Sequence, residues 1–349
     1  MIKFQADLFS TSKQNIMKNV ESQEAYLIQS FISKNYTNVG LINSIQKFSS
    51  LDINSKNLKV VTDKGEFVLK KWANKSAIRI RETLEIQSSL SLENLLVPNP
   101  IRTHSYDLLV VEKGEYYSLS SYVDGELYNP TLSSLESYFY SISNLFFKLK
   151  SLTISKPIRS AIDIDPIQII DSIKAALAHD SFWQENGLES EHSTLKDLAL
   201  LLFDDLNIFS NIYVEDSIQY SHYDLHPKNV LLVEDSIFGF LDFESCDLLN
   251  PNIAWGFSLI KMLRQAVVSE GKTSNLFELG QRSLENIRNV EFSKFIDVPS
   301  LPIFGRFELA RRLAYVLKDY FENDSKIWFM MLPIQVQLLE ESYLLFGKN

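Results

Sequence analysis

The chain has 349 residues, more than one hydrophobic core normally holds, so two lobes or domains are expected. Hydrophobic residues make up 45% and charged residues 22%, as in an ordinary globular protein, and the net charge of −10 argues against nucleic acid or an anionic membrane as the partner. Cys246 is the only cysteine, which excludes an internal disulfide and a Cys/His zinc site, and no apolar run approaches the ~18 residues of a membrane span. With no signal-peptide core at its start, the chain is expected to act in the cytoplasm.

The first third of the chain predicts a helix followed by a small β-rich lobe. Residues 1–36 read as a helical extension, with the helix at "SQEAYLIQSFISKNY". Over residues 37–123, "NLKVVTD" and "GEFVLKKW" flank a turn at "TDKGE", and "DLLVVE" and "EYYSLSSYV" flank a second at "KGE". Between these two hairpins, "SAIRIRETLEIQSSLS" predicts a helix. We therefore expect an antiparallel sheet with one helix, serving as a nucleotide-binding lobe.

Residues 124–349 predict a larger, mainly helical lobe for catalysis and substrate binding, joined to the first by a connector near 121–126. The one β-like interruption is a hairpin, "NVLLV" and "IFGFLDFE" around a polar turn. The predicted fold is thus α+β and bilobal. Amphipathic helices are expected at about 132–151, 166–180, 193–212, 253–269, 276–290, 305–322 and 327–346.

Polar residues stand at both ends of that hairpin. Asp224 and Asn229 come just before its first strand, and Asp242 ends its second. Because a hairpin brings its two ends together, these three side chains should converge at one edge. Two carboxylates and a carboxamide offer only oxygen ligands, which suit Mg²⁺ and not zinc.

The same residues have the order that phosphoryl transfer needs: a carboxylate base, an asparagine metal ligand and an aspartate metal ligand. "HYDLHPKN" has the spacing of the kinase catalytic loop H-R-D-x-x-x-x-N, and "LDFE" stands where D-F-G would. The segment "SHYDLHPKNVLL…GFLDFES…NP" resembles the aminoglycoside phosphotransferase and choline kinase-like group of small-molecule kinases, which share the protein-kinase-like fold. The resemblance is strong over about 221–251, fair over the small lobe and weak elsewhere.

For the catalytic loop, the resemblance implies a role for each matching residue. Asp224 would be the catalytic base, and Asn229 and Asp242 would hold Mg²⁺. His222 would fix the loop by hydrogen bonds. His226 would be a further catalytic residue, where protein kinases often have a lysine that reaches the moving phosphate. The implied activity is ATP- and Mg²⁺-dependent transfer of the γ-phosphate to a hydroxyl of a small molecule.

For the nucleotide, the resemblance implies a lysine on the small-lobe strand, paired with a helical glutamate. The family pattern selects Lys70 over its neighbour Lys71. Its partner would be Glu82 or Glu85, with Glu82 preferred, although Glu82 can pair locally with Arg79 and Glu85 with Arg81. The backbone of Ser121 and Val123 would meet the adenine edge; a preference for ATP over GTP cannot be read.

Three departures from the family pattern are visible, and two of them, the phosphate loop and Ala254, keep an inactive nucleotide-binding scaffold open as the alternative. The loop "KFSSLDINSKN" replaces a glycine-rich phosphate loop, Glu244 replaces the glycine of D-F-G, and Ala254 stands where an aspartate usually braces the catalytic loop. A protein kinase is less favoured, because little room remains for an activation loop. Arg311 and Arg312 could reach an anionic substrate, but a solvated helix face is the preferred interpretation. Sugars, amino alcohols and aminoglycosides are all candidate acceptors, and the oligomeric state is not predicted.

Overall fold

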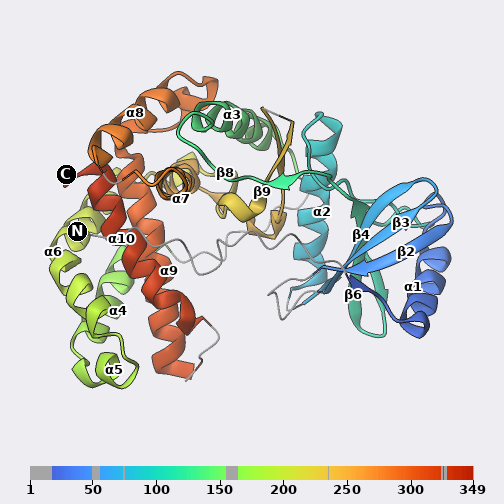
Figure 1. Ribbon diagram of the computed structural model, residues 1–349, viewed down its shortest axis with the longest axis horizontal. Helices are drawn as coiled ribbons and strands as arrows, with labels where there is room; N and C mark the ends of the chain where they lie inside the picture. Colours follow the sequence, from blue (N-terminus) through green and yellow to red (C-terminus); the bar gives the residue numbers. More distant parts are fainter. Residues whose placement is uncertain are drawn as a thin grey trace.

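The computed structural model describes residues 18–48, 56–73, 75–154, 164–234, 236–272, 274–323, 325 and 328–348. Figure 1 shows two lobes: a sheet with two helices at one end, and a mainly helical lobe at the other. The predicted bilobal α+β fold is confirmed.

The small lobe is built on a six-stranded antiparallel sheet with the strand order β1-β2-β3-β4-β6-β5. Both predicted hairpins are present, as β3–β4 and β5–β6. In the second hairpin the turn takes left-handed backbone at Lys113 and Gly114, as a two-residue turn requires. The strands are β1 Lys18–Asn19, β2 Ile42–Lys47, β3 Lys56–Thr62, β4 Gly65–Trp72, β5 Val110–Glu112 and β6 Glu115–Ser121.

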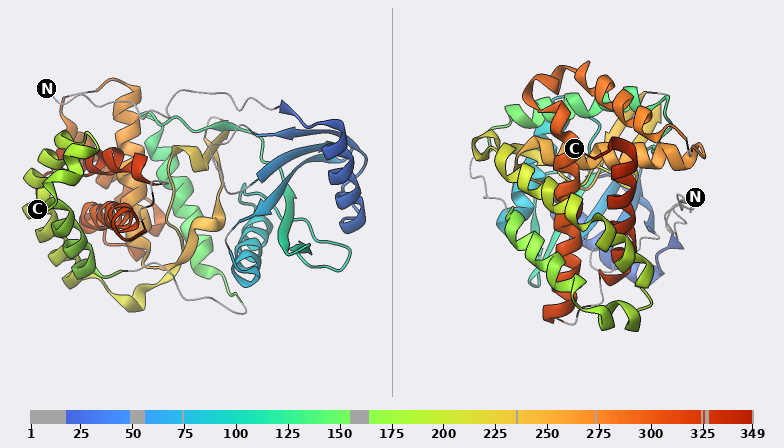
Figure 2. Two further views of the ribbon diagram at one scale, coloured as in Figure 1. Left: turned by 90° about the horizontal axis from the view of Figure 1, so that it is seen from below. Right: turned by 90° about the vertical axis from the view of Figure 1, so that its left-hand side faces the viewer.

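Two helices flank this sheet. Helix α1 (Ser22–Asn35) buries Ile32 against Val60, Leu69 and Leu119 of the strands, so the predicted N-terminal helix is part of the small-lobe core. A domain boundary at residue 36 stays a prediction. Helix α2 (Ala77–Leu92) is capped by the Ser76 hydroxyl. Figures 1 and 2 show α2 between the sheet and the large lobe.

The large lobe contains every predicted helix plus one that the sequence did not suggest, the short α5. Its helices are α3 Leu135–Ser151, α4 Pro166–Leu177, α5 Asp180–Glu185, α6 Glu189–Ile212, α7 Pro251–Ser269, α8 Leu276–Arg288, α9 Leu301–Asn323 and α10 Leu332–Phe346. Short 3₁₀ turns are η1 Glu215–Ser217, η2 Pro227–Asn229, η3 Phe243–Ser245, η4 Glu291–Phe295, η5 Val298–Ser300 and η6 Phe329–Met331. None of the helices, over the described ranges, is long and apolar enough to cross a membrane.

Helices α7 and α9 cross at a pair of glycines. A Cβ on Gly256 would lie 2.3 Å from the carbonyl oxygen of Leu301, and one on Gly305 would lie 2.5 Å from the carbonyl oxygen of Gly256. Both distances are far inside van der Waals contact, so only glycine allows this backbone approach. The crossing holds α9 tightly against α7, in the centre of the lobe.

The large lobe has two small sheets where the sequence predicted a single hairpin. The predicted hairpin forms from β9 (Val230–Glu234) and β10 (Ile237–Phe240), joined by β7 (Glu126–Leu127). A second antiparallel pair, β8 (Gln219–His222) and β11 (Cys246–Leu249), sets His222 opposite Cys246. The expectation of one β element was therefore wrong, because β11 has only four residues and its partner strand lies outside the hairpin. Together these pairs fix both ends of the segment between His222 and Cys246.

Candidate active site

The loop that follows β8 and the turn that follows β10 are joined by main-chain and side-chain hydrogen bonds. The N–H of Leu241 donates to the carbonyl of Asn229 at 2.9 Å. The Nε2 of His222 lies 2.7 Å from the carbonyl oxygen of Leu241. Asp242 follows Leu241 directly, so these bonds bring Asp224, Asn229 and Asp242 to one edge, as the hairpin geometry predicted.

His222 is a structural residue of this loop. Its side chain is fully buried, its Nδ1 accepts from the N–H of Asp224 at 3.4 Å, and its Nε2 meets the Leu241 carbonyl. One ring nitrogen accepts and the other donates, which is the pattern of a neutral imidazole. Burial lowers the pKa of His222 and favours the same neutral form.

The two oxygens of Asp224 have different surroundings. Oδ1 accepts from the Nη1 of Arg312 at 2.8 Å. Oδ2 faces the Nδ2 of Asn229 at 3.4 Å and the Nε2 of His226 at 3.6 Å. Burial alone would raise the pKa of Asp224, but the charge of Arg312 and the contact with His226 hold it well below its usual range. The carboxylate is therefore ionised.

Arg312 corrects the preferred interpretation of a solvated helix face. Its guanidinium donates to Asp224, to the carbonyl of Tyr223 at 3.1 Å and to the fully buried Glu308 at 2.7 Å, and it lies 4.1 Å from the ring centre of Phe257. The sequence shows the spacing of Glu308 and Arg312, one helical turn apart. It gives no sign of Asp224, which lies 88 residues away.

The chemistry of the donor set fits a divalent cation. Asn229 donates its Nδ2 to the main-chain oxygen of Asp224 at 2.9 Å, which fixes the carboxamide, and its oxygen is the atom that could bind a cation. Asp242 has left-handed backbone, with φ at 58°, a conformation that aspartate tolerates at functional turns. The side chain of Asp242 is exposed to solvent on one side. Loss of water on its other sides raises the pKa of its carboxyl, and the charge of Lys70 lowers it. The charges of Glu244 and Asp224 raise this pKa further. A cation would relieve this repulsion among carboxylates.

Lys70 faces this edge from β4. Its ammonium pairs with Glu244, whose carboxylate also forms an ion pair with Lys75 at 3.3 Å. The neighbouring Lys71 points elsewhere and pairs with Glu115 at 3.2 Å. Alternation along the strand thus selects Lys70 as the lysine next to the carboxylates.

Glu82 is held by partners other than that lysine in the contacts described, and its pairing with Lys70 stays a prediction. Buried at 3% exposure, Glu82 accepts from Arg79 at 2.6 Å and from the hydroxyl of Tyr220 at 2.7 Å. Arg79 also donates to the carbonyl of Cys246 at 2.8 Å and pairs with Asp247 at 3.0 Å. The local pair with Arg79 forms, and that arginine, one turn earlier on α2, is itself held by the large lobe.

Ser121 and Val123, the residues expected at the adenine edge, lie in the connector between the lobes. The N–H of Ser121 donates to the carbonyl of Asn99 at 2.8 Å, so this backbone donor is engaged within the protein. Val123 lies beside Gly239, whose added Cβ would be 3.2 Å from the valine side chain. Contact of Ser121 and Val123 with adenine stays a prediction. Most of the Ser/Asn-rich loop, residues 49–55, lies outside the described residues.

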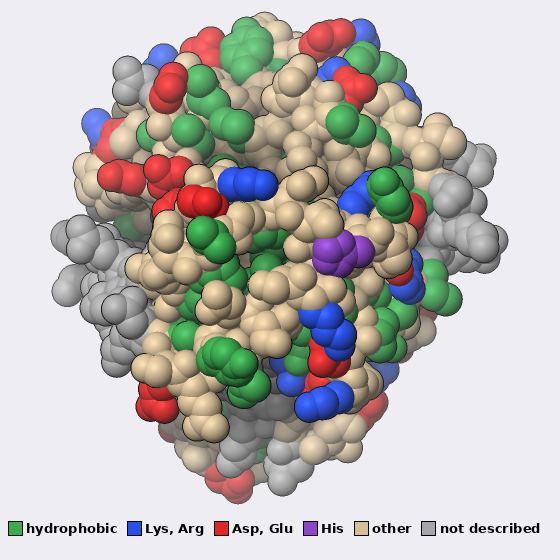
Figure 3. All heavy atoms as spheres, turned by 90° about the vertical axis from the view of Figure 1, so that its right-hand side faces the viewer, with side chains coloured by type: hydrophobic (Ala, Val, Ile, Leu, Met, Phe, Trp, Pro, Cys, Tyr) green, Lys and Arg blue, Asp and Glu red, His purple; other side chains and the backbone are tan. Residues whose placement is uncertain are grey.

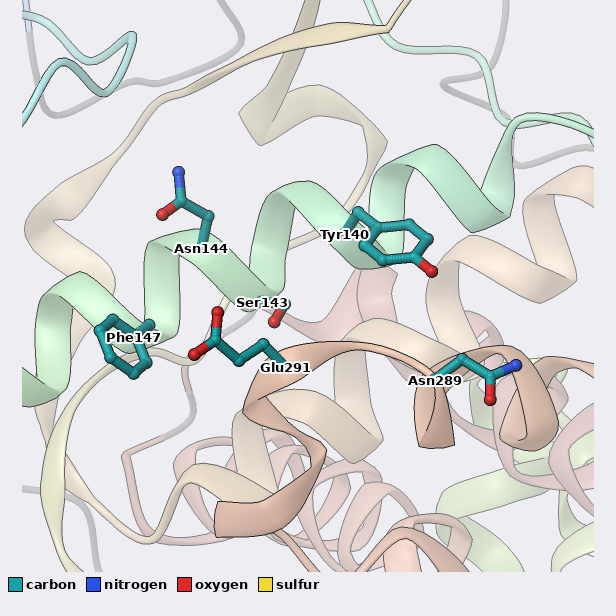
Figure 4. A pocket seen from close by; sticks show the side chains of 6 residues that line it. All are labelled: Tyr140, Ser143, Asn144, Phe147, Asn289 and Glu291. Atoms are coloured by element: carbon teal, nitrogen blue, oxygen red, sulfur yellow. The ribbon is translucent and has the colours of Figure 1, made fainter.

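Two surface hollows lie apart from these residues. One, of about 380 Å³, lies between α3 and the segment that follows α8 (Figure 4). The other, of about 410 Å³, lies at the end of β4 beside the β5–β6 turn. Neither is lined by Asp224, Asn229 or Asp242, so the carboxylate cluster, and not the volume of a hollow, identifies the site. On the end face of the small lobe, basic and acidic side chains are interspersed without a continuous basic patch (Figure 3).

Comparison with solved structures shows the fold. Spectinomycin phosphotransferase in complex with ADP and spectinomycin is 12% identical, with 95% of this chain and 99% of that chain covered and a TM-score of 0.63. Amicoumacin kinase in complex with AMP-PNP, Ca²⁺ and Ami is 9% identical, covering 94% and 96%, with a TM-score of 0.64. Choline kinase from Streptococcus pneumoniae is 13% identical, covering 92% and 99%, with a TM-score of 0.54.

Sequence comparison places the chain in a family. No curated protein sequence matches it significantly. The sequence model of the phosphotransferase enzyme family matches residues 44–251, which is more than half of the chain and includes β4, the catalytic loop and Asp242. With the bilobal fold and the carboxylate cluster already described, this match shows that the chain belongs to the phosphotransferase enzyme family.

Proposed function

We propose that the protein is an ATP- and Mg²⁺-dependent small-molecule kinase that transfers the γ-phosphate of ATP to a hydroxyl of a sugar, an amino alcohol or an aminoglycoside. The observation that carries this proposal is the convergence of Asp224, Asn229 and Asp242, held together by the bonds of Leu241 to Asn229 and His222. Ligands of the structural relatives agree with it: ADP and spectinomycin in one, AMP-PNP and Ca²⁺ in another.

Each residue has a part in this reaction. Asp224 orients the acceptor hydroxyl and takes its proton, and His226 stands next to that carboxylate. Lys70 leaves Glu244 to bind the phosphates, while the Ser121 carbonyl and Val123 border the adenine. Asn229 and Asp242 would hold Mg²⁺, which neutralises charge on the phosphates when bound. The rate gain comes mainly from positioning and electrostatics.

Two substitutions test the assigned roles. Asp224→Asn should reduce turnover by at least about 1,000-fold while ATP still binds, because only the proton acceptor is lost. Asp242→Ala should lose metal-dependent nucleotide binding, because a metal ligand is lost. Turnover is measured by ADP release and binding by calorimetry with and without Mg²⁺. Asp180→Asn, at an exposed position on α5, is the control, and turnover by both variants at the parental rate would contradict the roles.

The acceptor is found by a screen. Purified protein is supplied with Mg²⁺ and either ATP or GTP, together with panels of sugars, amino alcohols and aminoglycosides, and ADP or GDP release is followed. Acceptor-dependent release that Asp224→Asn abolishes supports the proposal. A thermal shift with ATP, without turnover on any acceptor or on water, would instead favour the inactive scaffold.

A further inference from the structure

An arginine from α9 reaches across the large lobe to the catalytic carboxylate. We propose that Arg312 is a positioning residue for the kinase reaction: together with Glu308 it orients Asp224 so that Oδ2 is the oxygen that receives the acceptor proton. This inference rests on the proposed function. It also assigns the brace of the catalytic loop to α9, where the family pattern places it on the helix that carries Ala254.

The contacts of Asp224 distinguish its two oxygens. Oδ1 is engaged by a charge-assisted bond of 2.8 Å from Arg312. The neighbours of Oδ2, Asn229 and His226, lie at 3.4 Å and 3.6 Å, too far for strong hydrogen bonds. An acceptor hydroxyl therefore meets less competition from existing hydrogen bonds at Oδ2 than at Oδ1. The bond from Arg312 to Oδ1 fixes the rotation of the carboxylate and so the position of Oδ2.

Arg312 is itself held in place on several sides. The fully buried Glu308 accepts from Arg312 at 2.7 Å and, through both of its oxygens, from Arg311 at 2.7 and 2.8 Å. The guanidinium of Arg312 lies over the ring of Phe257, and the Nη2 of Arg312 donates to the carbonyl of Tyr223. Because these three neighbours already fix the Arg312 side chain, it loses little conformational entropy when it holds Asp224.

The brace expected from the family pattern is absent at its usual place. Ala254 is fully buried and offers only a methyl group. Phe257 lies less than one turn further along α7, and the Arg312 guanidinium packs on its ring. The loop is thus tied from α9, by a cation that contacts both a main-chain carbonyl and the base.

The acceptor O–H gives its proton to Asp224 Oδ2, and its oxygen forms a bond to the γ-phosphorus of ATP. The bond between that phosphorus and the β,γ-bridging oxygen breaks, and ADP leaves with the electron pair. Arg312 takes no proton and forms no bond in this step; it keeps the base in the reactive orientation.

The test compares variants of two adjacent arginines in the full chain, with ATP turnover followed by ADP release. Arg312→Gln should lower kcat about 100-fold with little change in the KM for ATP or in nucleotide affinity, since a displaced base costs rate and not nucleotide binding. Arg311→Gln, which removes bonds to the same Glu308 and has none to Asp224, should lower kcat less than about threefold.

Chemical rescue separates positioning from folding. Guanidinium at millimolar concentrations should restore at least about tenfold of the kcat lost by Arg312→Ala and should do nothing for Arg311→Ala. If Arg312→Gln does not fold, Arg312→Lys decides, because lysine keeps the charge but cannot bridge three acceptors at once, and it should still lose about tenfold in kcat.

The outcomes distinguish this inference from the function beneath it. Parental kcat in Arg312→Gln or Arg312→Lys, equal losses in the Arg311 and Arg312 variants, or no guanidinium rescue would overturn the positioning role while leaving the kinase intact. A parent protein without turnover of ATP under any condition would overturn the proposed function and this inference with it.

Discussion

At the scale of single residues, two carboxylates near the site are each shared by two cations. Glu308 lies between Arg311 and Arg312, while Glu244 lies between Lys70 and Lys75. If Lys70 binds the nucleotide as proposed, its ammonium exchanges the Glu244 carboxylate for phosphate oxygens. Both exchanged groups are anionic, so the lysine keeps a partner throughout.

Glu308 should make stability depend on pH. Burial alone would raise the pKa of its carboxyl, but Arg311 and Arg312 hold it below its usual value. The ionised form therefore stabilises the fold above the unfolded pKa of about 4.3, and this stability is lost as the pH falls through the folded pKa. Glu308→Gln should cost about 3–5 kcal/mol at neutral pH, and its difference from the parent should narrow in acid.

Urea unfolding of parent and variant between neutral and acidic pH measures this difference. Glu285→Gln, at an exposed position on α8, is the matched control and should stay within about 0.5 kcal/mol of the parent at each pH. A constant difference in unfolding free energy between Glu308→Gln and the parent over the whole pH range would show that the ionisation of Glu308 does not contribute to stability.

Residues with a local signature were predictable, and those defined by distant partners were not. Asp224, Asn229 and Asp242 lie within one motif whose hairpin fixes their meeting. The positions of Arg312 and Glu244 in the site depend on contacts with residues 88 and 174 positions away in the sequence. Local sequence patterns do not indicate such contacts. Glu82 likewise has a partner that its local sequence does not indicate, because Tyr220 of β8 donates to it and Asp247 of β11 pairs with its neighbour Arg79.

At the scale of elements, the glycine crossing of α7 and α9 sets where the arginines of α9 lie. Gly256→Ala would place a methyl 2.3 Å from the Leu301 carbonyl and force the helices apart. We expect a loss of about 1–3 kcal/mol in unfolding free energy and a loss of kcat larger than the change in the KM for ATP, because α9 carries Arg312. Thermal unfolding and steady-state kinetics measure both.

Gly305→Ala, across the same contact, should behave alike. Ala266→Gly, further along α7, is a control for a change of helix propensity and cavity without a forced separation. Parental stability and kcat in Gly256→Ala would show that the crossing can relax without cost.

Elements with strong periodicity were predictable from the sequence. The amphipathic helices of the large lobe and both small-lobe hairpins follow patterns of 3.6 and 2 residues. The pair β8–β11 and helix α5 escaped, because four to six residues do not establish a period and strand partners far apart in sequence leave no local mark.

At the scale of the whole molecule, a buried arginine ties three helices of the large lobe together. Arg306 of α9 has no exposed surface and donates to Asp205 of α6 at 3.0 Å, to Ser342 of α10 and to the carbonyl of Gly347 at 2.7 Å. Tyr343 lies against its guanidinium and donates to Asp205 at 2.8 Å. The network closes the chain end onto the lobe core.

Arg306→Met should cost about 3–5 kcal/mol in unfolding free energy, because it leaves Asp205 buried without its guanidinium. Urea unfolding followed by tryptophan fluorescence measures the change. Arg282→Met, at an exposed position on α8, should stay within about 0.5 kcal/mol of the parent. An equal effect of the two substitutions would mean that the buried network adds nothing beyond a surface charge.

Helix α2 belongs to the small lobe by sequence but is bonded to the large lobe. Its Arg79 pairs with Asp247 and donates to the Cys246 carbonyl, and its Glu82 accepts from the Tyr220 hydroxyl. In regulated protein kinases the equivalent helix moves to switch activity on and off. Here such a swing would break a half-buried ion pair and strand two acidic groups. These contacts fix α2 as the protein folds, so we expect no separate activation step that moves this helix.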